Sequence, residues 1–164
     1  MENNYKPCCP EFNPSLFDGK EFDWMQKTFI KDSVMTFMHM PLNLHQVMLR
    51  MWNKIKNAEA APADQDFLML CYDPSAWKTE VYMTTTKIVP NANNITLSGN
   101  FMAKVFDGPY KDVSKFFKEM ETYVASKGKS ISKIYIHYTY CPKCIKHYGH
   151  NYMIFFAETQ ETVI

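Results

Sequence analysis

Cysteine and histidine, the residues that most often bind zinc, gather near the C-terminus in the stretch IYIHYTYCPKCIKHYGHNY (134–152). Cys141 and Cys144 form a CxxC pair, and His147 and His150 follow it. Structural zinc needs four ligands, often supplied as two closely spaced pairs. By itself the stretch could supply half a zinc site, act as a redox dithiol or form the wall of a binding pocket.

The other cysteines give this stretch little support. Cys8 and Cys9 lie far upstream, and their adjacency is a poor spacing for two ligands of one ion. Thioredoxin-like chemistry requires a CxxC that opens a helix after a strand. Here the pair lies between two predicted strands, so the prediction is a hairpin turn with reduced thiols, no metal and no cofactor. The alternative is a zinc site formed by Cys8, Cys9, Cys141 and Cys144.

Composition and charge exclude several classes of function. The net charge is +1 and the basic residues are dispersed, which argues against a nucleic-acid partner. No apolar run approaches the ~20 residues of a membrane span, and the N-terminus lacks a signal-peptide pattern, so we expect a cytoplasmic protein without a membrane partner. Aromatic residues make up 15% of the chain and there are 12 Met, which favours a deformable apolar cavity, with a Met-rich core as the alternative.

The chain after residue 32 reads as two β-α-β-β units, 33–89 and 98–158, in a domain that spans 33–164. The expected strands are 33–40, 66–72, 77–89, 99–106, 133–140 and 151–158, with helices after Pro41 and Pro109 and a linker at 90–98. Residues 1–32 read as an N-terminal arm. Within it Phe22, Met25 and Phe29 recur at spacings of three and four, which predicts a short helix or turn.

Alternation along the strands predicts which side chains share a face. In 133–140, Ile134 and Ile136 should meet the helices, so Tyr135 and His137 should face the cleft between the two units. In 77–89, the same reasoning assigns Glu80 and Tyr82 to the cleft. A single bulge would reverse such an assignment.

Glu80 and His137 are the candidate catalytic residues. Desolvation would raise the pKa of a buried Glu80, which would allow it to bind a cationic ligand or act as a general base or acid. The alternative for Glu80 is a solvated residue paired with Lys78 or Lys104. The alternative for His137 is a histidine satisfied by a backbone group.

Several motifs, in order along the chain, resemble the GyrI-like small-molecule-binding family and in particular its free-standing members. The motifs are PLN (41–43), SAW (75–77), VFDGPYKD (105–112), YCPKC (140–144) and YGHNYMIFFAE (148–158). The resemblance implies an α+β fold with pseudo-twofold symmetry, antiparallel sheets, helices outside and a central ligand cleft. It also implies binding of hydrophobic aromatic small molecules, including xenobiotics, and similarity to hydrolases that open strained cyclopropane rings within an aromatic cage.

Together these considerations predict a set of ligand-binding residues. They are Phe37, His39, Trp77, Tyr82, Phe106, Tyr110, Tyr135 and Tyr140. Nothing in the sequence separates a hydrolase from the alternative, a non-catalytic module that sequesters drugs or acts as an adaptor.

Overall fold

Strands and helices follow one another in two similar rounds along the chain. The computed structural model describes residues 6–162. The first round comprises β1 (Glu21–Phe37), β2 (Met40–Pro41), α1 (Leu44–Asn57), β3 (Met69–Ser75) and β4 (Lys78–Thr84). The second comprises β5 (Asn93–Asp107), α2 (Val113–Ser126), β6 (Lys129–Tyr138), α3 (Pro142–Tyr148) and β7 (Tyr152–Glu161). Short 3-10 turns η1 (Pro14–Leu16), η2 (Asp64–Asp66) and η3 (Tyr110–Asp112) complete the order.

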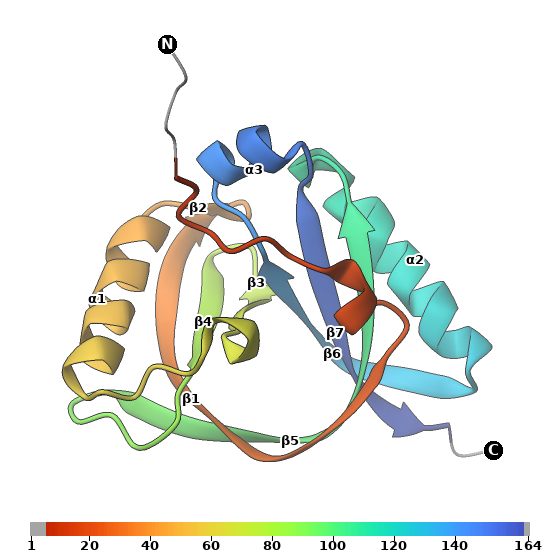
Figure 1. Cartoon of the computed structure of the whole chain (residues 1–164). Helices are drawn as coiled ribbons and strands as arrows, with labels where there is room; N and C mark the ends of the chain where they lie inside the picture. Colours follow the sequence, from red (N-terminus) through yellow and green to blue (C-terminus); the bar gives the residue numbers. More distant parts are fainter. Residues whose placement is uncertain (1–5, 163–164) are drawn as a thin grey trace.

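All strand pairings are antiparallel, in the order β2-β1-β4-β3-β6-β7-β5. Strand β1 also pairs with β5, from Glu21 opposite Met102 to Lys31 opposite Asn93. This pairing joins the two ends of the sheet, so the six long strands form a closed ring (Figure 1). The α+β class and the antiparallel sheet expected from the sequence are confirmed.

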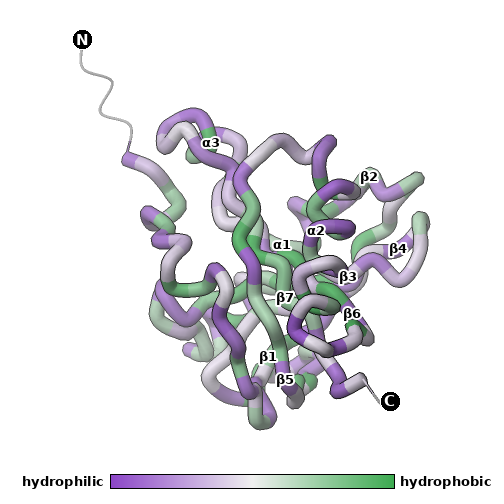
Figure 2. Tube along the Cα trace, turned by 90° about the vertical axis from the view of Figure 1, so that its right-hand side faces the viewer, coloured by the Kyte–Doolittle hydropathy of each residue, from purple (hydrophilic) through white to green (hydrophobic). Residues whose placement is uncertain are grey.

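Helices α1 and α2 lie on opposite sides of the ring (Figure 1). Helix α1 buries Val47, Met51 and Ile55, which are four residues apart and therefore lie on one face. Helix α2 buries Phe116, Met120 and Val124 with the same spacing. Each helix covers the outer face of the sheet with this stripe, and in Figure 2 hydrophobic colour gathers along the central strands.

Ten buried residues fill the inside of the ring. They are Trp24, Phe29, Leu68, Leu70, Tyr82, Phe101, Ala103, Tyr135, Ile154 and Phe156. Phe29, Phe101 and Phe156 are among the largest side chains that are fully buried. The interior is therefore a second apolar layer, separate from the two layers under the helices.

The helix or turn predicted over Phe22, Met25 and Phe29 is wrong, since these residues belong to β1. A bulge places two residues, Met25 and Gln26, opposite Ser98 alone. The extra residue shifts the alternation, so that Trp24 and Phe29, five apart, both face the interior. Because of the bulge, apolar residues of this strand recur at spacings that are typical of a helix.

The predicted arm is correspondingly shorter than 1–32, because strand begins at Glu21. Residues 6–20 cross the front of the ring from α3 to the start of β1 (Figure 1). Phe12 and Phe17 pack against the interior cluster, and the backbone N–H of Gly19 donates to the carbonyl of Ala103 at 3.0 Å. The arm is therefore attached to the ring along its course.

Further boundaries differ from the prediction, since β4 ends at Thr84 and not at residue 89. Strand β5 begins at Asn93, inside the expected linker 90–98. The expected hairpin turn at the CxxC is instead helix α3, which has Cys141 as its N-cap residue and Pro142 at its first position. Gly149, with φ 75°, ends the helix in the left-handed conformation that glycine adopts readily.

Replacement of Phe156 by alanine tests the interior layer. Because the Phe156 ring is fully buried among other aromatic rings, Phe156→Ala should lower the free energy of unfolding by about 3–5 kcal/mol. Leu49→Ala, at a half-exposed position on α1, is the control and should change it by less than about 1 kcal/mol. Urea unfolding measures both, and similar losses in the two variants would contradict a packed interior.

Candidate functional site

Tyrosine rings form one wall of the interior. Tyr82 of β4 meets Tyr135 of β6 edge to face, with ring centroids 5.6 Å apart. Tyr72 of β3 lies 5.7 Å from Tyr135 on the same wall. Tyr82 and Tyr135 are buried while Tyr72 is half-buried, so the wall reaches from the core toward solvent.

Glu80 lies at the polar edge of this wall with 13% of its side chain exposed. Its carboxylate accepts a hydrogen bond from the Tyr82 hydroxyl at 2.6 Å, and Lys31 Nζ lies 3.0 Å from Oε1. Lys78 Nζ lies 3.5 Å from the same oxygen, as the paired alternative for Glu80 anticipated. The structure therefore brings together three predicted site residues, Glu80, Tyr82 and Tyr135.

The predicted rise in the pKa of Glu80 is wrong in direction. Burial does raise the pKa of this carboxyl, but the hydrogen bond from Tyr82 and the charge of Lys31 outweigh it. The pKa therefore lies below its ordinary value, and Glu80 is a carboxylate at neutral pH.

The tyrosine hydroxyls stay protonated. Burial raises the pKa of Tyr135 to about 12, and the negative charges of Glu158 and Glu80 add to the effect. Burial and the bond to Glu80 raise the pKa of Tyr82 still further. Both hydroxyls are thus hydrogen-bond donors at neutral pH.

Sequence reasoning missed Lys31, Tyr72, Lys133 and Glu158 at this site. Lys133 Nζ lies 5.2 Å from the centre of the Tyr72 ring, and Lys31 Nζ lies 5.5 Å from that of Tyr82. Glu158 follows Ile154 and Phe156 at intervals of two, so alternation along β7 would have found it. Lys31 was missed because it lies within residues 1–32, which were predicted to be an arm and not part of a strand.

The inner face becomes exposed at one end of β1. By alternation, Phe37 lies on the same face as Phe29, yet it is 55% exposed, and its ring packs against Trp77 with centroids 5.5 Å apart. Trp77 is 61% exposed. His39 stands in the turn after β1, where Nδ1 lies 3.7 Å from Asp73. These three predicted residues form an exposed rim.

His137 is held by the backbone. Its Nδ1 lies 3.0 Å from the backbone nitrogen of Met69, and in the neutral ring it accepts a hydrogen bond from that N–H. The same Nδ1 lies 3.2 Å from the carbonyl oxygen of Met69, to which a protonated ring would donate. Burial lowers the pKa of His137 to about 4, so the ring is neutral at pH 7. The contact matches the backbone-satisfied alternative, and it occupies one ring nitrogen.

Three predicted ligand-binding residues lie away from the tyrosine wall. Phe106 packs under α2, stacked on Phe116 with centroids 4.7 Å apart. Tyr110 is exposed and lies edge to face with Tyr138, and Tyr138 packs against the layer under α2. The Tyr140 hydroxyl accepts the backbone N–H of Phe12 at 2.8 Å, which places it under the arm.

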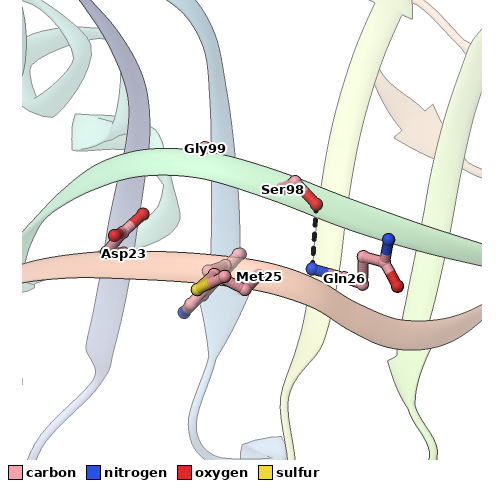
Figure 3. A pocket seen from close by; sticks show the side chains of 6 residues that line it. Asp23, Met25, Gln26, Ser98 and Gly99 are labelled. Atoms are coloured by element: carbon pink, nitrogen blue, oxygen red, sulfur yellow. Dashed lines mark hydrogen bonds between the residues drawn. The ribbon is translucent and has the colours of Figure 1, made fainter.

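The bulge in β1 produces a hollow of about 720 Å³ at the surface. Figure 3 shows Met25 and Gln26 at this hollow, with the Gln26 N–H donating to Ser98 Oγ at 2.8 Å. Met25 is 84% exposed. The hollow lies on the β1–β5 seam and contains none of the predicted site residues.

The four cysteines near the termini come together in space. The sulfur atoms of Cys8, Cys9, Cys141 and Cys144 all lie within 4.8 Å of one another. Folding therefore brings Cys8 and Cys9 to the CxxC, although their adjacency in the sequence is a poor spacing for two ligands of one ion.

Comparisons with known proteins agree with the fold. The profile of a family described as "Bacterial hydrolase" matches residues 1–159. The crystal structure of the EcmrR C-terminal domain has a TM-score of 0.67 at 10% identity, over 87% of this chain and 96% of that one. An uncharacterized conserved protein from Listeria innocua gives 0.66 at 8% identity, over 88% and 94%. No curated protein matches the chain.

Two further structures were solved with a partner or a ligand. SAV2435 bound to tetraphenylphosphonium gives a TM-score of 0.53 at 13% identity, over 86% of this chain and 93% of that one. An EcmrR-DNA complex gives 0.64 at 10% identity, over 87% and 56%. The GyrI-like fold is shared, and the absence of a nucleic-acid partner stays a prediction. Within residues 6–162, no helix is both long and apolar enough to cross a membrane.

The low pKa of His137 predicts how stability depends on pH. Between the ordinary pKa of about 6.5 and the folded value of about 4, the unfolded chain takes up a proton that the half-buried ring of the folded chain does not. The free energy of unfolding should therefore fall by about 3 kcal/mol from this group as the pH drops from about 7 to about 4. His137→Asn keeps an acceptor for Met69 but cannot titrate, so urea unfolding should show a shallower pH dependence. An unchanged slope would contradict the assignment.

Proposed function

The chain belongs to the bacterial hydrolase family, and we propose that it binds hydrophobic aromatic small molecules against its tyrosine wall and hydrolyses strained cyclopropane rings in them. The observation that carries this proposal is the Glu80 carboxylate, largely buried beside Tyr82 and Tyr135. A charged group in an aromatic wall is costly to maintain for stability alone. Such groups are concentrated at functional sites.

The surroundings of Glu80 suit a flat aromatic ligand. Tyrosine rings offer an apolar face for stacking and a hydroxyl that can donate to a polar group of the ligand. The exposed rings of Phe37 and Trp77 at the rim extend this surface toward solvent. Half-buried Tyr72 is the ring that an entering ligand would turn aside. Binding of tetraphenylphosphonium by SAV2435, which has the same fold, supports an aromatic ligand here.

The same groups can add water to a strained ring. The ligand stacks on the tyrosine wall, and the Tyr82 hydroxyl turns from Glu80 to donate its hydrogen bond to a conjugated carbonyl of the ligand. A water molecule then donates a hydrogen bond to Glu80 in its place. The water oxygen bonds to a cyclopropane carbon while a ring C–C bond breaks, and that electron pair moves to the carbonyl oxygen as an enolate. Glu80 takes a proton from the water, and the enolate takes the hydroxyl proton of Tyr82. Glu80 then passes its proton to the Tyr82 oxygen, which restores both groups. The product is the substrate plus one water.

His137 is the second predicted catalytic residue, and its contact with Met69 supports a different role. With Nδ1 held by the backbone, the ring joins β6 to β3 at the end of the tyrosine wall. We propose that Glu80 receives the proton and that His137 positions Tyr135, two residues before it in β6.

Replacement of Glu80 tests the hydrolysis. Glu80→Gln preserves size but cannot accept a proton, so turnover of a cyclopropane-containing alkylating agent should fall at least ~100-fold. Glu119→Gln, which removes a carboxylate of an exposed pair on α2, is the control and should leave turnover unchanged. Intact-mass analysis of the small molecule detects the product, heavier by one water. Equal turnover in Glu80→Gln and wild type would contradict the proposed role.

A second candidate function is binding without turnover, as a drug sink or adaptor. The low pKa of Glu80 favours it, because Tyr82 and Lys31 already occupy the carboxylate and make it a weak base. In this case the cyclopropane-containing alkylating agent is recovered from the complex with its mass unchanged.

Binding itself is tested with tetraphenylphosphonium. Tyr135→Leu removes a central ring of the wall and should weaken binding about tenfold, as the loss of an aromatic contact to a cation implies. Phe106→Leu, under α2, is the control and should bind like the wild type. Isothermal titration calorimetry measures both, and a loss confined to Phe106→Leu would place the ligand elsewhere.

A further inference from the structure

The four clustered cysteines have the spacing of metal ligands. Cys8 Sγ lies 3.5 Å from Cys141 Sγ, 3.6 Å from Cys144 Sγ and 4.0 Å from Cys9 Sγ. An S–S bond would require about 2.05 Å, so these are contacts between separate sulfur atoms. Around a tetrahedral zinc ion with Zn–S bonds of about 2.3 Å, neighbouring sulfurs lie about 3.8 Å apart.

We propose that Cys8, Cys9, Cys141 and Cys144 together bind one Zn²⁺ ion in a closed structural site. Four thiols lose four protons on binding, and the ion offsets the repulsion among the resulting thiolates. Four soft sulfur ligands in a tetrahedron select zinc or iron. An iron–sulfur cluster spreads its thiolates over several iron atoms, whereas these sulfurs all lie within 4.8 Å of one another.

Contacts outside the sulfur cluster hold the two halves of the site together. The backbone N–H of Cys141 donates to Cys9 Sγ at 3.4 Å, and the Tyr148 hydroxyl donates to the Cys9 carbonyl at 2.9 Å. The Tyr140 ring stacks on Tyr148 with centroids 4.7 Å apart, and its hydroxyl accepts the N–H of Phe12. Such outer contacts orient ligands before the ion binds.

The site would fasten the arm to α3. Cys8 and Cys9 lie near the start of the described part of the arm, while Cys141 is the N-cap residue of α3 and Cys144 lies in its first turn. Farther along the arm, Phe12 and Phe17 pack on the interior cluster. The ion would thus hold the arm across the front of the ring, and with four protein ligands it leaves no open position for catalysis.

Elemental analysis of the full-length chain tests the site. We expect one zinc ion per chain, the same content in Cys71→Ala, and loss of zinc in the double variant Cys8→Ser/Cys141→Ser. Cys71 is the matched control because it lies in β3, outside the cluster. After zinc is exchanged for Co²⁺, the wild type should show the intense visible bands of a tetrahedral tetrathiolate.

Measurements on the wild type alone decide the question if the double variant does not fold. Four more thiols should react with Ellman's reagent after a chelator is added, and cleavage after Glu11 by a glutamate-specific protease should become faster. A chain without zinc, a chain with iron in its place, disulfide bonds among these cysteines or unchanged thiol reactivity would each overturn the proposal. None of these outcomes depends on small-molecule binding or hydrolysis.

Discussion

Pairing of β1 with β5 is the constraint on which the rest of the structure depends. Each β-α-β-β unit buries one face of its strands under its own helix, which leaves the other face, rich in aromatic residues, without a cover. The β1–β5 pairing closes the ring, so the two uncovered faces meet and bury Trp24, Phe101 and Phe156 together. Closure also removes the open edges that a sheet of this size would otherwise present. The bulge at Met25 and Gln26 permits it, because bulges bend a strand sharply and strengthen its twist.

The shared interior explains why the polar residues lie where they do. Rings at the centre of the wall are fully enclosed, while the Tyr82 hydroxyl reaches Glu80 at its edge. Lys31 comes from β1, the strand that also closes the ring, and it reaches Glu80 across the pairing of β1 with β4. The arm lies across the front of this interior, and the proposed zinc ion at its start would make the cover stable. Closure of the ring and the charge of Glu80 therefore both depend on strand β1.

Much of this fold could be predicted from local patterns. The apolar stripes of α1 and α2 and the inward facing of Glu80 and Tyr82 follow from periods of 3.6 and 2, which depend only on neighbouring residues. The predictions that were wrong concern features that depend on residues distant in sequence. The bulge in β1 is defined by Ser98, and the pKa of Glu80 is lowered by Lys31 as well as by neighbouring Tyr82. The cysteine cluster joins residues more than a hundred positions apart. The CxxC was assigned to a turn because a seven-residue helix is too short to show a clear period.

The central claim is that the tyrosine wall beside Glu80 binds an aromatic small molecule. A crystal structure of the chain with bound tetraphenylphosphonium tests it most directly. The account predicts phenyl rings packed against Tyr72, Tyr82 and Tyr135, with the phosphonium on the Glu80 side of the wall. A ligand seated instead in the surface hollow at Met25 and Ser98 (Figure 3), with the tyrosine wall unchanged, would contradict it.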